Sequence, residues 1–354
     1  MRNHLLRSCV IGSVLVMSGH SGGCEPGPAA AFAPEVAKSR PDEAPQPAAE
    51  AHAQANGSAP YGADRRKKRV ERRAVGASVP ARPMRLRPAR RTQSNGVNTW
   101  LIFGFTEGAD TGQKGERTAF HESVIRIART MPGYAAWDGS WGVTYSTSDS
   151  VVVWGGGSAA VERNAAGIDS PVSTRGFGAS AGLKYQLLQR NPSPIGLAVQ
   201  LAPYWQRIEG SAIARETVGS EFRLLIDRAL GSEQLFGAFN LAYQPERTTS
   251  SVSGVANRSN LEIAGAVTAR ILPRVFTGGE LRYVNTYLGY FLNERLGWAL
   301  FAGPTIYLAI GSSGYLGLAW SVQLLGQSAG DNVSGLDLVH FERHQLRLKL
   351  GFAF

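Results

Sequence analysis

The chain ends in the stretch Leu346-Arg347-Leu348-Lys349-Leu350-Gly351-Phe352-Ala353-Phe354. Apolar side chains alternate with charged or small ones, so that Leu346 and every second residue after it share one face, while Arg347 and Lys349 share the other. Successive side chains of a strand point to opposite sides. This period of two therefore predicts a closing β-strand with one apolar and one polar face.

The same alternation recurs through the chain from about residue 117. Phe222, Leu224 and Ile226, for example, fall opposite Glu221 and Arg223. Turn residues separate the alternating segments, and we expect one antiparallel strand per segment. The expected strands lie near residues 117–130, 134–147, 150–163, 173–188, 195–208, 216–229, 234–246, 258–271, 275–290, 296–310, 314–327 and 342–354.

Three features favour a transmembrane barrel over a soluble sandwich. The segments are longer than ordinary soluble strands. Short turns alternate with longer connections, expected near 163–173, 209–216, 247–258, 328–341 and, shorter, 291–295. Aromatic residues stand toward strand ends, as interfacial girdles do. These are Trp141, Trp154, Tyr185, Trp205, Tyr243, Tyr283, Tyr287, Trp298, Tyr307 and Trp320.

The predicted fold is therefore all-β, a transmembrane antiparallel up-and-down β-barrel of twelve strands over residues 98–354, preceded by a disordered N-terminal arm. Trp100–Thr106 is apolar enough for a thirteenth strand. An odd number would start the first strand outside the cell, so we expect 98–116 to be a periplasmic or lumenal lead-in. A barrel of this kind belongs to the outer membrane of a Gram-negative bacterium.

Charge is unevenly distributed along the chain. The formal net charge is +10, yet residues 98–354 carry 21 Lys and Arg against 20 Asp and Glu. Residues 1–24 carry Arg2 and Arg7 before a short apolar run, which is the order of a signal peptide, with cleavage as late as residue 33. Residues 25–97, rich in Ala and Pro and then in Arg, predict a disordered arm.

The arm could be a solvated linker or a contact for anionic polymer or lipid. Nucleic acid is not favoured as a partner, because no aromatic side chains interleave with the basic run Arg65–Arg91. The partners that follow from the predicted barrel itself are outer-membrane lipid, the barrel-insertion machinery and small polar solutes.

Two resemblances support this prediction. The terminal strand is similar to the assembly signal of outer-membrane barrels, which implies that the insertion machinery reads Leu350, Phe352 and Phe354. Residues 103–116, with 134–137, 301–305 and 341–345, resemble an uncharacterised family of Gram-negative outer-membrane barrels described as transport proteins. The family implies architecture and location, but no substrate and no catalytic residue.

Charged residues on the polar faces are predicted to line the lumen, because a lipid-facing Arg or Lys costs about 2–4 kcal/mol at the membrane midplane. They are Glu122, Arg126, Lys184, Glu221, Arg223, Asp227, Glu262, Glu280, Arg282, Arg347 and Lys349. The set predicts either a porin-like passive channel, or transport protein, for small polar solutes, or a lumen closed by its own ion pairs. In the second case the barrel is structural and its surface loops bind an external partner.

Evidence for chemistry is weak. Two G-x-S-x-G matches centre on Ser180 and Ser328, but the strand-to-helix elbow of hydrolases is not expected at either. The barrel region holds three histidines, His121, His340 and His344, and no metal motif. We expect no enzyme and no cofactor.

Overall fold

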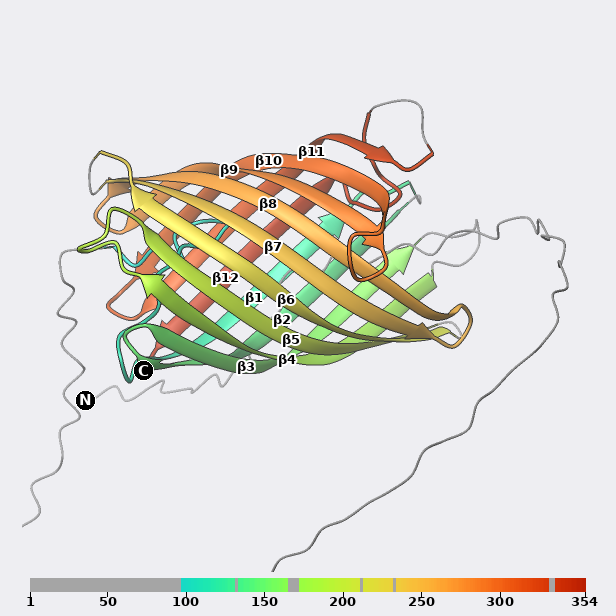
Figure 1. Ribbon diagram of the computed structural model, residues 1–354, viewed down its shortest axis with the longest axis horizontal. Helices are drawn as coiled ribbons and strands as arrows, with labels where there is room; N and C mark the ends of the chain where they lie inside the picture. The colour runs from blue at the N-terminus through green and yellow to red at the C-terminus, as the bar shows by residue number, and fades with distance from the viewer. Residues whose placement is uncertain (1–96, 131–132, 165–171, 211–212, 232–233, 331–334) are drawn as a thin grey trace, which may run out of the picture. The chain divides into compact units, whose positions relative to one another are not determined.

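The computed structural model describes residues 97–354 except 131–132, 165–171, 211–212, 232–233 and 331–334. The expected signal peptide, and the expected arm up to residue 96, lie outside the described residues. The described part forms a closed antiparallel barrel of twelve strands, each hydrogen-bonded to the next, with the last returning to the first (Figure 1). This confirms the predicted fold class. The strands are β1 (Arg117–Ile127), β2 (Ala135–Ser148), β3 (Val151–Asn164), β4 (Val172–Leu188), β5 (Gly196–Gly210), β6 (Ile213–Ala229), β7 (Leu235–Ser250), β8 (Gly254–Leu272), β9 (Val275–Leu288), β10 (Glu294–Ile310), β11 (Gly314–Ser328) and β12 (His344–Ala353).

The barrel closes between its first and last strands. β1 and β12 pair from Thr118 opposite Ala353 to Ile127 opposite His344. The amide of Phe354 donates to the carbonyl of Arg117 at 3.0 Å. We call the end where β1 begins and β12 ends the terminal end, and the opposite end the loop end.

The outer surface of the barrel is apolar and the inner surface is polar. Phe177, Leu281 and Phe352 are 51%, 50% and 57% exposed, whereas Lys184 and Arg347 are 0% and 5% exposed. In water, a continuous apolar surface of this kind would be unfavourable, but lipid chains cover it at no cost. Among the described residues no helix is long and apolar enough to cross a membrane.

Two of the expected girdle aromatics face the lumen instead of lipid. Trp154 lines a cavity inside the barrel and lies over Gly182, where a Cβ atom would stand 2.1 Å from the indole ring. Tyr307 packs on Phe276, with ring centroids 5.7 Å apart, beside the inward cluster of Phe236 and Phe276. The alternation predicts that these two aromatics lie on one face of their strands. Whether that face points to lipid or to the lumen depends on the packing partners inside the barrel.

The connections at the loop end are mostly shorter than the sequence predicts. β5 ends at Gly210 and β6 begins at Ile213, while β7 ends at Ser250 and β8 begins at Gly254. The polar residues expected in loops here pair across the ladder, so that β8 reaches 19 residues. A tilted strand needs only about 9–11 residues to cross a bilayer. The residues beyond this length extend the strands into water, where both faces of a strand can be polar.

Candidate functional site

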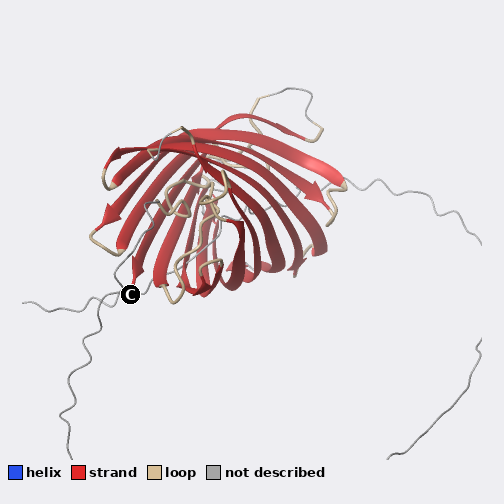
Figure 2. Ribbon diagram, turned by 60° about the vertical axis from the view of Figure 1, so that its left-hand side comes forward, coloured by secondary structure: helices blue, strands red, loops and turns tan. Residues whose placement is uncertain are grey.

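The segment before β1 lies inside the barrel, and we call residues 97–116 the plug. Figure 2 shows loop segments within the ring of strands. Near the terminal end, Ile102 and Phe103 of the plug are 1% and 2% exposed and pack against Phe236 and Phe276 of the wall. The apolar run that resembled a thirteenth strand is thus a lumenal anchor without strand pairing.

The middle of the plug is held at its backbone by wall side chains. Glu280 of β9 accepts from the amides of Phe105 and Thr106 at 2.7 and 3.1 Å. Asn240 of β7 accepts from the amide of Glu107 and donates to its carbonyl, both at 2.8 Å. A carboxylate and a carboxamide here supply the partners that strand pairing gives elsewhere.

The returning half of the plug is held in the same manner. The ammonium of Lys184 donates to the carbonyl of Gly108 at 2.6 Å. Asp227 accepts from the amide of Ala109 at 2.6 Å, and Arg190 stands 2.9 Å from the same carboxylate. Arg190 also pairs with Asp110 of the plug. The plug therefore rises from the terminal end to mid-lumen and returns to the start of β1.

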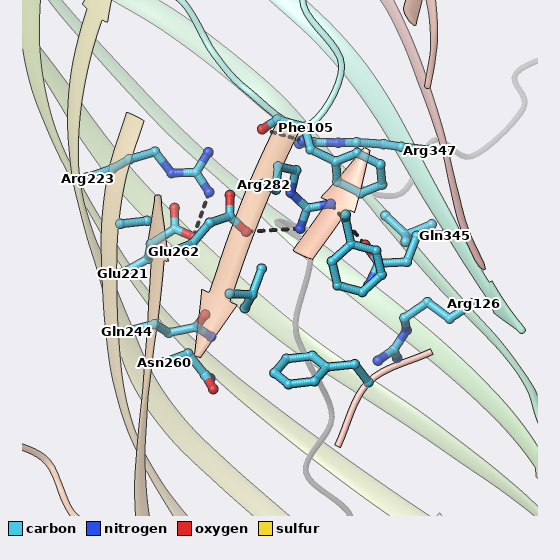
Figure 3. Close-up of a pocket in the computed structure, with 15 residues that line it drawn as sticks. Phe105, Arg126, Glu221, Arg223, Gln244, Asn260, Glu262, Arg282, Gln345 and Arg347 are labelled. Carbon is cyan, nitrogen blue, oxygen red and sulfur yellow. Dashed lines mark hydrogen bonds and ion pairs between the residues drawn. The ribbon is translucent and has the colours of Figure 1, made fainter. Parts of the chain in front are cut away.

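Every charged residue that the sequence assigned to the lumen lies on the inner side of the wall. Most are less than 10% exposed, and the side chain of Glu262 is the most open at 18%. The structure brings them into specific pairs, some of which Figure 3 shows. The pairs within the wall are Arg347 with Glu122 at 2.6 Å, Arg223 with Glu221 at 2.8 Å, Arg282 with Glu262 at 2.9 Å, and Arg126 with Asp138.

Three of the assigned residues, Lys184, Asp227 and Glu280, hold the plug and not one another. Lys349 is 7% exposed, and no hydrogen bond or ion pair joins its ammonium to another residue within the described part of the chain.

Glu107 of the plug lies among cations of the wall. Its carboxylate is 3.4 Å from Arg223 and 3.8 Å from Arg347. Burial raises the pKa of Glu107. The positive charges of Arg223, Lys349, Arg347 and Lys184 lower it by more than burial raises it, so that the pKa is about 2. The carboxylate is therefore charged at every physiological pH.

Two cavities flank the plug. The central cavity has about 60 Å³ of water-accessible space and lies between Phe105 of the plug and Phe341 of the β11–β12 connection (Figure 3). The side cavity has about 100 Å³ and lies between the plug and the wall, lined among others by Glu107, Trp100 and Lys349. Since one water needs about 10–15 Å³ by this measure, each cavity holds only a few molecules.

The loop end is narrowed by the β11–β12 connection. Phe341 is 1% exposed and packs on Phe301 of the wall, with ring centroids 6.3 Å apart. Glu342 pairs with Arg129 at 2.5 Å and with Arg126 at 3.4 Å. Burial raises the pKa of Glu342, but these two arginines lower it more, and the net shift is downward.

The wall charges were visible in the sequence, but their partners in the plug and the connection were not. Glu107, Asp110 and Glu342 lie outside the alternating segments and carry no period-two signal of their own. One signal could have found the plug: residues 103–116 lack alternation, yet they include a Phe-Gly-Phe run that is too apolar for a solvated leader.

Neither G-x-S-x-G match forms a hydrolase site. Ser180 lies within β4, and no helix follows the strand. Ser328, His340 and Asp337 do meet, but the hydroxyl and the carboxylate both contact Nδ1 of His340, at 3.4 and 3.1 Å. A triad needs the serine on one ring nitrogen and the acid on the other. Among the described residues, no cluster of His, Cys, Asp and Glu could hold a metal ion.

The terminal aromatic residues face outward from the last strand. Phe352 and Phe354 are 57% and 66% exposed, and Leu350 is half-buried on the same face. They pack little against the rest of the barrel. Their role in assembly stays a prediction.

Residues 97–354 match the family model described as a family of unknown function, DUF6662. The chain belongs to this family. The DUF6662 match spans the plug and the twelve strands of the described residues. With its closed barrel and apolar belt, this DUF6662 member is an outer-membrane protein. No curated protein matches the chain.

Several solved outer-membrane barrels are similar in fold. The translocator domain of autotransporter NalP from Neisseria meningitidis is 12% identical, with a TM-score of 0.45, covering 70% of this chain and 91% of that one. The COG4313 outer membrane channel from Pseudomonas putida F1 is also 12% identical, with a TM-score of 0.45 and coverages of 70% and 98%. The Pseudomonas putida toluene transporter TodX is 8% identical, with a TM-score of 0.41 and coverages of 73% and 99%. Likenesses this distant do not indicate what the DUF6662 chain does.

Proposed function

We propose that this protein is an outer-membrane channel for small polar solutes, closed in this state by the plug, and that passage requires the plug to move. The observation that carries the proposal is the manner of attachment. The plug adds no strand to the barrel, and side chains such as Glu280 and Asn240 hold its middle part. Side-chain bonds can be exchanged for water without opening the ladder of the barrel.

The seam between plug and wall is polar enough to be hydrated. The hydroxyl of Thr106 in the plug and that of Thr305, beside Gly104 of the plug, are buried without a hydrogen-bond partner among the described residues. Buried polar atoms normally bind water when protein supplies no partner. A hydrated seam costs less to separate than an apolar core, which would have to be exposed to water.

A second candidate is a non-conducting barrel that is structural or binds a partner through its loop end. The anchor of Ile102 and Phe103 against Phe236 favours it, because these apolar contacts oppose departure of the plug. The 1:1 ion pairs of the wall favour it as well. The two candidates differ in one measurable property, which is conductance.

The test is single-channel recording of the refolded full chain in planar bilayers, beside a variant in which residues 99–111 are replaced by a Gly/Ser linker of the same length. We expect rare brief openings for the natural chain and a stable ohmic conductance for the variant. The linker keeps its backbone amides, but it lacks the apolar anchor of Ile102 and Phe103 and the carboxylate of Glu107. Its glycine-rich backbone also loses more conformational entropy on docking, and so we expect it to leave the lumen open.

Folding of the variant is checked by heat-dependent gel mobility, which distinguishes a closed barrel from an unfolded chain. Asn240→Ala, which removes one clamp and leaves the plug sequence intact, serves as a second variant with more frequent openings expected. Folded barrels of both variants that carry no current would refute the channel and leave the structural barrel.

A further inference from the structure

The wall cations beside the plug are not all paired in the same way. Arg223 pairs with Glu221 and Arg347 with Glu122, so that both arginines have a carboxylate from the wall itself. Lys349 has no such partner among the described residues. Lys349 therefore differs from these two arginines, which each have a close carboxylate of the wall.

Two other charged residues of the wall near Glu107, Lys184 and Glu280, bind backbone groups of the plug. The ammonium of Lys184 is bound by the plug carbonyl of Gly108, and the carboxylate of Glu280 is bound by two plug amides. These two charges are opposite in sign and offset each other. Of the wall cations around Glu107, Lys349 is thus the one that no hydrogen bond or ion pair joins to another described residue.

The plug places the carboxylate of Glu107 among these cations. Its carboxylate approaches Arg223 at 3.4 Å and Arg347 at 3.8 Å, longer than the 2.8 and 2.6 Å that these arginines keep to Glu221 and Glu122. Glu107 thus occupies the second position on the guanidinium of Arg223, which the wall leaves open. On Arg347 it lies beside the nitrogen that already donates to Glu122, while Nη1 of Arg347 donates to the plug carbonyls of Gly104 and Phe105. Such longer contacts are weaker than the close pairs of the wall, so that another carboxylate can replace Glu107.

The side cavity adjoins this position. Its lining includes the charged residues Glu107, Glu116, Glu122, Arg347 and Lys349 and the rings of Trp100 and Tyr315. Glu122 is already paired with Arg347. Lys349, at the edge of the side cavity, is only 7% exposed. A buried ammonium without a partner is costly, and a carboxylate is the group that relieves the cost. The rings suit an apolar body attached to that carboxylate.

We infer that Glu107 stands in the binding position of a solute carboxylate, and that the channel admits small organic anions with an apolar or aromatic body. A solute that reaches the side cavity would contact Lys349 and compete with Glu107 for Arg223 and Arg347. Loss of the Glu107 contacts weakens the hold on the plug, so that the solute itself favours opening. This inference rests on the channel function proposed above.

The first test measures the charge preference of the open lumen. In the variant with the Gly/Ser linker at 99–111, the reversal potential in a KCl gradient should shift toward the chloride equilibrium potential. Lys349→Gln in that background should reduce the shift. Arg228→Gln removes an exposed cation and is the matched control, with no change expected.

The second test uses the natural full chain and sodium benzoate as the probe. At constant ionic strength, benzoate should raise the open fraction about fivefold, the change that one weakened ion pair produces. Sodium acetate, which lacks the apolar body, should act less, and benzylammonium chloride should not act. Glu107→Gln should open more often without any probe and lose the response to benzoate.

The outcomes separate the two proposals. A folded linker variant that carries no current overturns the channel itself. A linker variant that conducts but prefers potassium, or natural chain that responds equally to benzoate and benzylammonium, overturns the anion inference and leaves the channel intact.

Discussion

Glu280→Ala should loosen the middle of the plug without damage to the barrel. The carboxylate accepts from the amides of Phe105 and Thr106 at 2.7 and 3.1 Å, and also from the hydroxyl of Ser321 at 3.3 Å. A hydrogen bond to a charged group contributes about 1.5–3 kcal/mol. Because Phe105 borders the central cavity, water can reach the freed amides and offset part of this loss. We expect a net cost of about 2 kcal/mol to plug docking.

A cost of about 2 kcal/mol corresponds to an increase of roughly thirtyfold in the ratio of open to closed plug. The assay is the open fraction in planar bilayers, supported by maleimide labelling of Thr106→Cys with and without Glu280→Ala, in chains whose Cys9 and Cys24 are replaced. The labelling rate should rise with the open fraction, because Thr106 is fully buried in the closed state.

Glu246→Ala is the matched control for this prediction. Glu246 is also a buried lumenal carboxylate, at 7% exposure, but it accepts its hydrogen bond from the hydroxyl of Tyr204 of the wall at 2.9 Å. It should leave openings unchanged. The reasoning is refuted if Glu280→Ala folds and opens no more often than the natural chain, or if Glu246→Ala opens it equally.

Three further predictions concern stability, assembly and pH. Gly303→Ala should destabilise the barrel by about 1–3 kcal/mol in urea, because the new Cβ would lie 1.6 Å from the carbonyl of Trp320, whereas Gly265→Ala, with 3.9 Å of space, should be close to neutral. Phe354→Ala should lower the assembled fraction in cells, measured by heat-dependent gel mobility. It should leave the urea midpoint of the refolded protein unchanged, because the ring is 66% exposed. Equal losses in both measurements would contradict an assembly signal. Burial raises the pKa of the Glu342 carboxyl, but two arginines lower it more, so that Glu342 should stabilise the barrel fully above its ordinary pKa of 4.5. This contribution should be lost as the pH falls through the lowered pKa. Glu342→Gln should therefore flatten the acid side of the curve of stability against pH, and an unchanged curve would contradict the prediction.

Much of the wall was predictable from residue order. The alternation of Leu346 to Phe354 and of similar segments predicted twelve strands, and the described residues form twelve. The cost of a charge in lipid assigned Arg223, Arg347 and Lys349 to the inner face, and the structure places them there. Both inferences need only local pattern and the solvent on each side of a strand.

The loop end was less predictable, because polar residues form loops or water-exposed strands with equal ease. Residues near 247–250 and 254–258 were expected in a loop and are paired strand. Trp154 and Tyr307 were expected to face lipid, and they face the lumen. An aromatic ring suits either environment, so its direction depends on what packs beside it.

The sequence by itself determined the barrel, its strand number and the sign of each face, because these follow from a period of two and from the cost of polar groups in lipid. Only the tertiary structure decided what fills the lumen. Glu107 meets Arg223 and Arg347 across 116 and 240 positions of the chain, and Asn240 meets Glu107 across 133. Such contacts exist only after the barrel has closed around the plug, and no local pattern records them.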